Sequence, residues 1–165
     1  MEVELHPSDG SAVLLASYNY GSKEMLLEPQ RGTSKLHSTY QVLLPQSYGS
    51  KASQQTASDQ FVKFGEGVYL KNLFSEEFLS YDDTVMRDPL LIRSVAPSKM
   101  FCFTRPYNYV RREDGAVPYN TELRLCSLNA ETFLRHRKVP GHSTVYSLAL
   151  SKVDYDPLIL HRSSL

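Results

Sequence analysis

The chain has 165 residues, and its 18 basic side chains balance 18 acidic ones, so the formal net charge at pH 7 is zero. Its 41% apolar and 22% charged fractions are ordinary for a globular protein, and the length fits a single domain over residues 1–165. Nucleic acids and anionic membranes favour a basic surface, so this balance argues against nucleic-acid binding. The apolar runs are too short to cross a bilayer, and we expect no membrane insertion.

Three features of the sequence predict a reduced, cytoplasmic location. The first ten residues, MEVELHPSDG, lack the basic and apolar stretches of a secretory signal. Cys102 and Cys126 show no metal-binding or redox spacing. No asparagine is followed by the x-Ser/Thr of a glycosylation site.

An internal repeat is the main signal along the chain. A short apolar alternation at residues 13–17, 68–72 and 123–127 is followed each time by a second apolar segment, at 25–28, 78–82 and 133–137. The three starts, Val13, Val68 and Leu123, are separated by 55 residues each. Because alternation with period two is typical of half-buried strands, we expect a hairpin in each copy. Phe78 and Phe133 then become expected core residues.

Further short strands are predicted between the three hairpins. The repeats are placed at approximately 11–65, 66–120 and 121–165, with four strands in each and roughly twelve in all. No helical period of useful length appears. A threefold period in a chain of many short strands predicts an all-β fold of the β-trefoil type, in which three units close a six-stranded barrel capped by three hairpins. The additional strands are expected at 40–44, 61–64, 90–95, 100–103, 145–150 and 158–161.

Two segments interrupt the threefold pattern. Residues 47–60 are rich in Ser, Gln and Ala and are expected to form a long loop. Residues 104–121 form an insertion whose Asp114-Gly115 predicts a tight turn and a protruding hairpin. Tyrosine is frequent at recognition surfaces, so exposed loop tyrosines predict a partner-binding surface, with cross-strand packing as the alternative. The candidates are Tyr18 and Tyr20, in a predicted loop of the first copy, and Tyr107, Tyr109, Arg111, Arg112 and Tyr119, in the insertion at 104–121.

The second and third copies each resemble a known group of β-trefoils. The second, GVYLKNLFSEEFLSYDD followed by LLIRSV and MFCF, resembles the MIR-type domains found in the inositol trisphosphate and ryanodine receptor families. The third, SLNAETFLRHRK, is similar to arabinofuranose-binding trefoils, whose repeats carry a similar aromatic-leucine-arginine-histidine ending. These resemblances imply the trefoil fold and a binding role for its loops, which differs between trefoil families. The chain departs from ricin-type lectins, because it has no tryptophan and therefore no Gln-x-Trp motif.

Two short polar clusters are the candidate ligand-binding residues. Arg135, His136 and Arg137 form the most basic cluster, and arginine can bind carboxylate, phosphate or sugar hydroxyl groups. The alternative is a solvent-exposed strand end. Tyr81, Asp82 and Asp83 occupy the corresponding place in the second copy. There an aromatic ring and carboxylates suit a sugar, and the alternative is a turn stabilised by aspartate.

Nothing in the sequence indicates catalysis. The chain lacks G-x-S-x-G, H-E-x-x-H, P-loop and G-x-G-x-x-G motifs, and its five histidines lack metal-ligand spacing. We therefore predict a binding module with no catalytic residue, metal or cofactor. The leading hypothesis is an intracellular protein-interaction or scaffold module that binds another protein. A carbohydrate-binding module that binds a glycan is the alternative, and a protease inhibitor of trefoil type is the third hypothesis.

Overall fold

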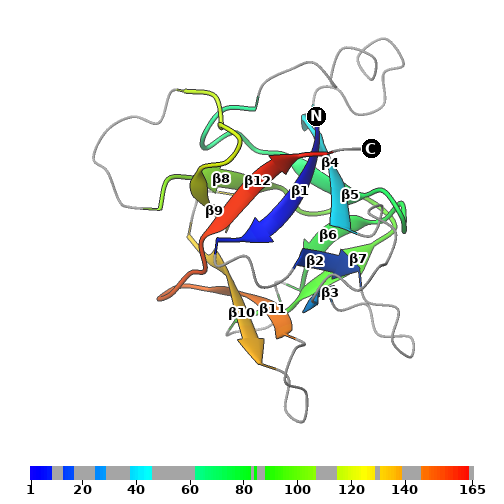
Figure 1. Cartoon of the computed structure of the whole chain (residues 1–165). Coiled ribbons are helices and arrows are strands. Elements are labelled where there is room, and N and C mark those ends of the chain that lie inside the picture. Colours follow the sequence, from blue (N-terminus) through cyan, green and yellow to red (C-terminus); the bar gives the residue numbers. More distant parts are fainter. Residues whose placement is uncertain are drawn as a thin grey trace.

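The computed structural model consists of short β-strands, with no α-helix among the residues it describes (Figure 1). It describes residues 1–8, 13–16, 25–28, 38–45, 62–82, 84, 88–106, 115–128, 131–138 and 146–163, with backbone only for 13–16, 25–28, 137–138 and 146–147. The twelve strands are β1 (Glu2–Pro7), β2 (Val13–Ala16), β3 (Met25–Glu28), β4 (Thr39–Leu43), β5 (Tyr69–Asn72), β6 (Phe78–Tyr81), β7 (Leu91–Ser94), β8 (Phe101–Thr104), β9 (Glu122–Ser127), β10 (Phe133–Lys138), β11 (Tyr146–Ser151) and β12 (Leu158–Arg162).

Six of the strands close a barrel. The antiparallel pairs are β1 with β4, β4 with β5, β8 with β9, β9 with β12, and β12 with β1. The remaining junction, between β5 and β8, is a bridge in which Val68 and Phe101 each donate a backbone N–H to the other's carbonyl at 2.8 Å. Because the ring is closed, no barrel strand presents an unpaired edge.

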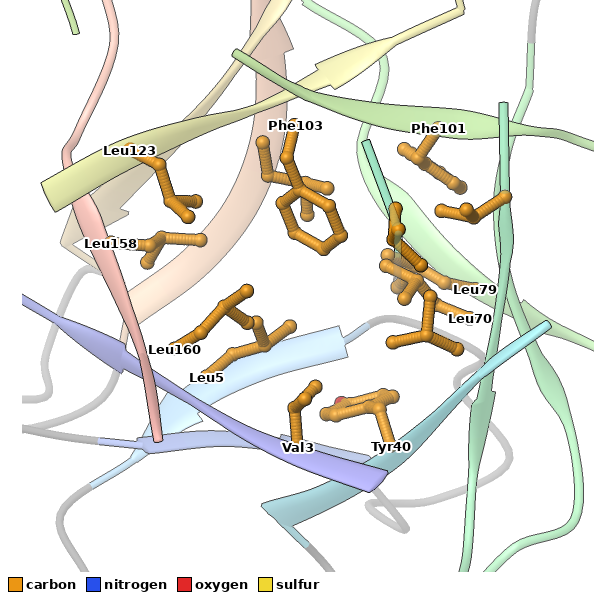
Figure 2. Packing of buried hydrophobic residues seen from close by; sticks show 14 of the residues in the cluster. Val3, Leu5, Tyr40, Leu70, Leu79, Phe101, Phe103, Leu123, Leu158 and Leu160 are labelled. Atoms are coloured by element: carbon orange, nitrogen blue, oxygen red, sulfur yellow. The ribbon is translucent and has the colours of Figure 1, made fainter. Parts of the chain in front are cut away.

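Threefold symmetry is visible in the barrel register and in the side chains that fill it (Figure 2). The first and fourth strands of the three repeats meet at Val3↔Tyr40, Val68↔Phe101 and Leu123↔Leu158. Neighbouring repeats meet at Val42↔Leu70, Phe103↔Leu125 and Leu160↔Leu5. All twelve of these side chains are at most 2% exposed. One apolar core shared by the three repeats therefore fills the barrel.

Three hairpins, β2–β3, β6–β7 and β10–β11, cap one end of this barrel (Figure 1). They also join one another, because β11 pairs with β3 and Leu90 forms a bridge to Ala149. A closed six-stranded barrel with three capping hairpins is a β-trefoil. The predicted fold class and number of strands are thereby confirmed.

The predicted alignment of the first repeat is wrong by one strand. Val3, and not Val13, occupies the place of Val68 and Leu123, so the first repeat begins with β1, before the expected boundary at residue 11. Val13 lies in β2, and its pairing with Glu28 is equivalent to Phe78↔Ser94 in β6–β7. The local alternation of apolar residues does not distinguish barrel strands from strands of the capping hairpins, because strands of both kinds bury apolar side chains.

The hairpin predicted in the first copy is observed as β2–β3, but those predicted in the second and third copies differ from the observed ones. β5 and β6 share the single register pair Lys71↔Phe78, whereas β6 pairs along its length with β7. Phe78 is 4% exposed, but Phe133 is only half-buried, and neither belongs to the central cluster. The expected core role of Phe133 is therefore corrected to a position at the outer wall of the barrel.

The strand predicted at 61–64 is observed only as an isolated bridge, which joins it to the insertion at 104–121. Lys63 forms a bridge to Ala116, and the Val117 N–H donates to the Val62 carbonyl at 2.8 Å. Val117 is buried in the central cluster, and Tyr119 packs against that cluster. The tip of the predicted hairpin, residues 107–114, lies outside the described residues.

A pair of histidines on the outer face of β1 and β12 predicts a pH dependence of stability. The His6 and His161 rings meet edge-on at 4.5 Å, and the His6 Nε2 lies 3.5 Å from the Glu4 Oε2. Burial, followed by the charge of His161, lowers the pKa of His6 despite the nearby Glu4 carboxylate. The unfolded chain therefore binds this proton more readily, and the free energy of unfolding should fall as the pH drops below the ordinary histidine pKa of about 6.5.

The substitution His161→Gln removes the second cause of the lowered His6 pKa and should reduce this slope, while burial of His6 retains part of it. Urea unfolding between about pH 5 and about pH 8, across the range where histidine titrates, measures it. Arg162→Gln, at an exposed position on the same strand, is the control. An unchanged slope in His161→Gln would show that the two rings are not coupled.

Candidate functional site

Aromatic and charged side chains gather in the third repeat, where the segment before β12 runs beside β10. This segment is held in place by the backbone, because the Asp156 N–H donates to the Leu134 carbonyl at 2.9 Å. We call the group the third-repeat cluster. Its members are Arg124 from β9, Phe133, Arg135 and His136 from β10, and Asp154, Tyr155 and Asp156 from the segment before β12.

The base of the third-repeat cluster is a buried arginine between two aromatic rings. The Arg124 guanidinium lies 4.4 Å from the Phe133 ring centroid and 5.2 Å from that of Tyr155, and Arg124 is 7% exposed. Its Nε donates to the Thr104 Oγ1 at 3.1 Å. The rings of Phe133 and Tyr155 also meet edge-on at 6.3 Å. These cation–π and ring contacts hold Tyr155 in one orientation.

The outer part of the cluster consists of two acid–base pairs. The Asp156 Oδ2 accepts from the His136 backbone N–H at 2.6 Å and lies 3.0 Å from the ring Nδ1. Burial by itself would raise the pKa of Asp156, but the side-chain and backbone hydrogen bonds of His136 and the charges of His136 and Arg135 lower it overall. The second pair joins the Arg135 Nη1 to the Asp154 Oδ2 at 3.5 Å, and these side chains are 37% and 59% exposed. The Arg135–Asp154 pair therefore places a guanidinium and a carboxylate at the surface, beside the half-buried Tyr155.

The equivalent place in the second repeat has different chemistry. Ser80 and Tyr81 stand where the third repeat has Arg135 and His136, and Lys99 stands where it has Asp156. The Tyr81 ring packs edge-on against Phe101 at 5.8 Å, with the Lys99 Nζ 5.2 Å from its centroid. Tyr81 is thus partly used in packing against the core.

Asp82 forms a turn in the second repeat. Its Oδ1 accepts from the Thr84 hydroxyl at 2.6 Å and from the Thr84 backbone N–H at 3.0 Å. These two bonds hold the pKa of the exposed Asp82 carboxyl below its ordinary value. The arrangement is the one expected of an aspartate that stabilises a turn.

The structure places the predicted ligand residues in two separate hairpins. Tyr81 belongs to β6, which Asp82 follows, and Arg135 and His136 belong to β10, so the two clusters are repeat-related and do not form one site. Of the partner-binding candidates, Tyr119 is half-buried and packs against the core. The remaining predicted positions lie outside the described residues or, for Arg137, have an undescribed side chain: Tyr18, Tyr20, Asp83, Tyr107, Tyr109, Arg111, Arg112 and Arg137.

Sequence reasoning missed five members of the third-repeat cluster as site residues: Phe133, which it expected in the core, and Arg124, Asp154, Tyr155 and Asp156. The run Asp154-Tyr155-Asp156 directly before a predicted strand carried a signal, since it combines two carboxylates with a ring. Arg124 carried no such signal. An arginine that alternates with Leu123 and Leu125 indicates an outward-facing side chain, but the sequence does not indicate which residues pack over it.

The described residues hold no group of three or more His, Cys, Asp or Glu side chains that could bind a metal ion. Within the same part of the chain, no helix is long and apolar enough to span a membrane.

Comparison with known proteins supports the fold. The structure is similar to that of a ricin B-like lectin from Macrolepiota procera in complex with lactose, with a TM-score of 0.64, 10% sequence identity, and coverage of 99% of this chain and 96% of that chain. No protein-family model matches the chain, and no curated protein matches it. At this identity the similarity concerns the shared trefoil architecture.

Proposed function

We propose that the chain is a non-catalytic carbohydrate-binding module whose site is the third-repeat cluster. The observation that carries the proposal is the exposed Arg135–Asp154 pair beside Tyr155 and the His136–Asp156 pair. A carboxylate accepts hydrogen bonds from sugar hydroxyls, a guanidinium donates to them, and an aromatic ring packs against the apolar face of a sugar. The trefoil likeness to a lectin supports the same class of ligand.

This proposal takes precedence over the protein-interaction and protease-inhibitor hypotheses. The protein-interaction hypothesis depends mainly on loop tyrosines outside the described residues, whereas the third-repeat cluster is an arranged set of groups. Because the chain has no tryptophan, the aromatic surface for a sugar has to come from another ring, and Tyr155 lies beside the exposed Arg135–Asp154 pair. Tyr155 is the residue we assign to that role.

Two substitutions test the proposal after a glycan array has identified a ligand. Asp154→Asn and Arg135→Ala should each weaken glycan binding about tenfold or more, since a hydrogen bond to a charged group contributes roughly 1.5–3 kcal/mol. Isothermal titration calorimetry measures the dissociation constant. The melting temperature should change little, because both side chains are substantially exposed.

Asp82→Asn is the matched comparison, because it removes an exposed carboxylate of the second repeat. It should leave the dissociation constant unchanged. Loss of binding in Asp82→Asn, with normal binding in the two third-repeat variants, would move the site to the second repeat. A glycan array without signal at high protein concentration would refute a carbohydrate ligand altogether.

A further inference from the structure

The two cysteines of the chain face each other across neighbouring barrel strands. Cys102 on β8 and Cys126 on β9 are register partners at 1% and 0% exposure, and both are in the reduced form. Nothing in the proposed glycan site requires either thiol. Their placement therefore needs a separate explanation, and their register supplies one.

Backbone hydrogen bonds define the type of this cross-strand pair. The N–H and C=O groups of Phe101 are both bonded to Val68, and the Phe103 carbonyl accepts from the Gly65 N–H at 2.9 Å. Phe101 and Phe103 thus direct backbone hydrogen-bonding groups away from β9. Because these directions alternate along a strand, the backbone N–H and C=O groups of Cys102 point toward β9. Cys102↔Cys126 is therefore a hydrogen-bonded antiparallel pair, for which the Cα–Cα distance is about 5.5 Å. Disulfides span Cα–Cα distances of about 4.4–6.8 Å.

The two side chains lie together on the outer surface of the barrel wall, since Phe101, Phe103 and Leu125 fill the interior. The Cys102 Sγ donates to the Ser127 carbonyl at 3.4 Å, and the Cys126 Sγ lies 3.1 Å from the Thr104 Oγ1. A hydrogen bond with the Cys102 thiol, followed by burial, raises the pKa of the Cys126 thiol. The thiolate is the reactive species, so oxidation is expected during folding, before the pair is buried.

We propose that Cys102 and Cys126 form a cross-strand disulfide, closed during folding by a small-molecule disulfide such as oxidised glutathione, which locks β8 to β9. The thiolate of one cysteine attacks the glutathione disulfide, whose S–S bond breaks and releases one glutathione thiolate. The thiolate of the other cysteine attacks the mixed disulfide and releases the second. The two cysteines lose two electrons and two protons, and oxidised glutathione gains them as two glutathione thiols.

The full chain, unfolded in urea, is refolded in oxidised and reduced glutathione and, in parallel, in dithiothreitol. The oxidised sample should be monomeric, lighter by two hydrogen atoms, and resistant to alkylation in urea. Its melting temperature should exceed that of the dithiothreitol sample by roughly 5–10 °C, from the stabilisation expected of a disulfide. Cys102→Ala, treated identically, should show no such difference between the two conditions.

A folded chain whose two thiols remain open to alkylation after oxidative refolding would overturn the proposal. Glutathione adducts or disulfide-linked dimers in place of the internal bond would also overturn it. If the chain does not refold from urea, expression in the bacterial periplasm gives the second measurement, with the same mass and alkylation criteria. The cytoplasmic location stays a prediction, and a closed bond in the periplasmic chain would indicate compatibility with an oxidising compartment.

Discussion

Phe103→Ala should lower the free energy of unfolding by about 3–5 kcal/mol, the range for removal of a large aromatic side chain from a packed core. Phe103 is 0% exposed and lies opposite Leu125, where the second and third repeats meet. The truncation leaves a cavity in the layer that holds the repeats together (Figure 2). We therefore expect the whole barrel to weaken in one cooperative transition.

Urea unfolding followed by circular dichroism measures this loss, with Val153→Ala as the control. Val153 is 90% exposed, and its truncation should change the free energy of unfolding by less than about 0.5 kcal/mol. A loss of less than about 1 kcal/mol in Phe103→Ala would be incompatible with a residue in a close-packed core. Two separate transitions would contradict the single core shared by the three repeats.

The sequence predicted the fold because the second and third repeats preserve their inward positions. Val68 and Leu70 return as Leu123 and Leu125 at the same spacing, and all four are fully buried. The first repeat was misplaced because its barrel strand shows only Val3 and Leu5 between charged or polar residues. The run at residues 13–15 is more apolar and resembles a barrel strand more closely. β1 pairs with β12, which lies far away in the sequence, so no local sequence pattern indicates this pairing.

The turn after β5 explains why the hairpin expected in the second copy was not found. The Asn72 Oδ1 accepts from the backbone N–H groups of Phe74 at 3.0 Å and Ser75 at 3.1 Å, and Glu76 adopts a positive φ of 58°. This turn carries the chain from the barrel to the cap, where β6 pairs with β7. The apolar patterns identified every strand except β1, but the partner of each strand was determined by turn geometry and by closure of the barrel.

Only two of the seven members of the third-repeat cluster could be predicted as site residues, for a similar reason. Arg135 and His136 were identified from their own charge, within one short run. Their partners Asp154 and Asp156 belong to a segment about twenty residues later, which reaches β10 only after β11 has returned along it. Pairs between residues far apart in the sequence depend on tertiary structure. Charge alone therefore indicated a basic cluster, whereas the fold pairs each basic side chain with an aspartate.

Arg124→Ala should lower the free energy of unfolding by roughly 2–4 kcal/mol. Each cation–π contact contributes about 0.5–2 kcal/mol, and the substitution also removes the hydrogen bond to Thr104 and leaves a cavity. Arg162→Ala, at an exposed position on β12, is the control and should be nearly neutral. Urea unfolding at neutral pH measures both changes.

Arg124→Met separates the charge from the packing in this second prediction. Methionine keeps much of the apolar stem, so it removes the guanidinium and leaves a smaller cavity than alanine does. If the guanidinium is what holds Tyr155, the methionine variant should be more stable than the alanine variant but bind the array-selected glycan more weakly than the unsubstituted chain, because the ring loses its support. A methionine variant with unchanged glycan affinity would mean that the segment holds Tyr155 without Arg124, through the Asp156–Leu134 and Asp156–His136 hydrogen bonds.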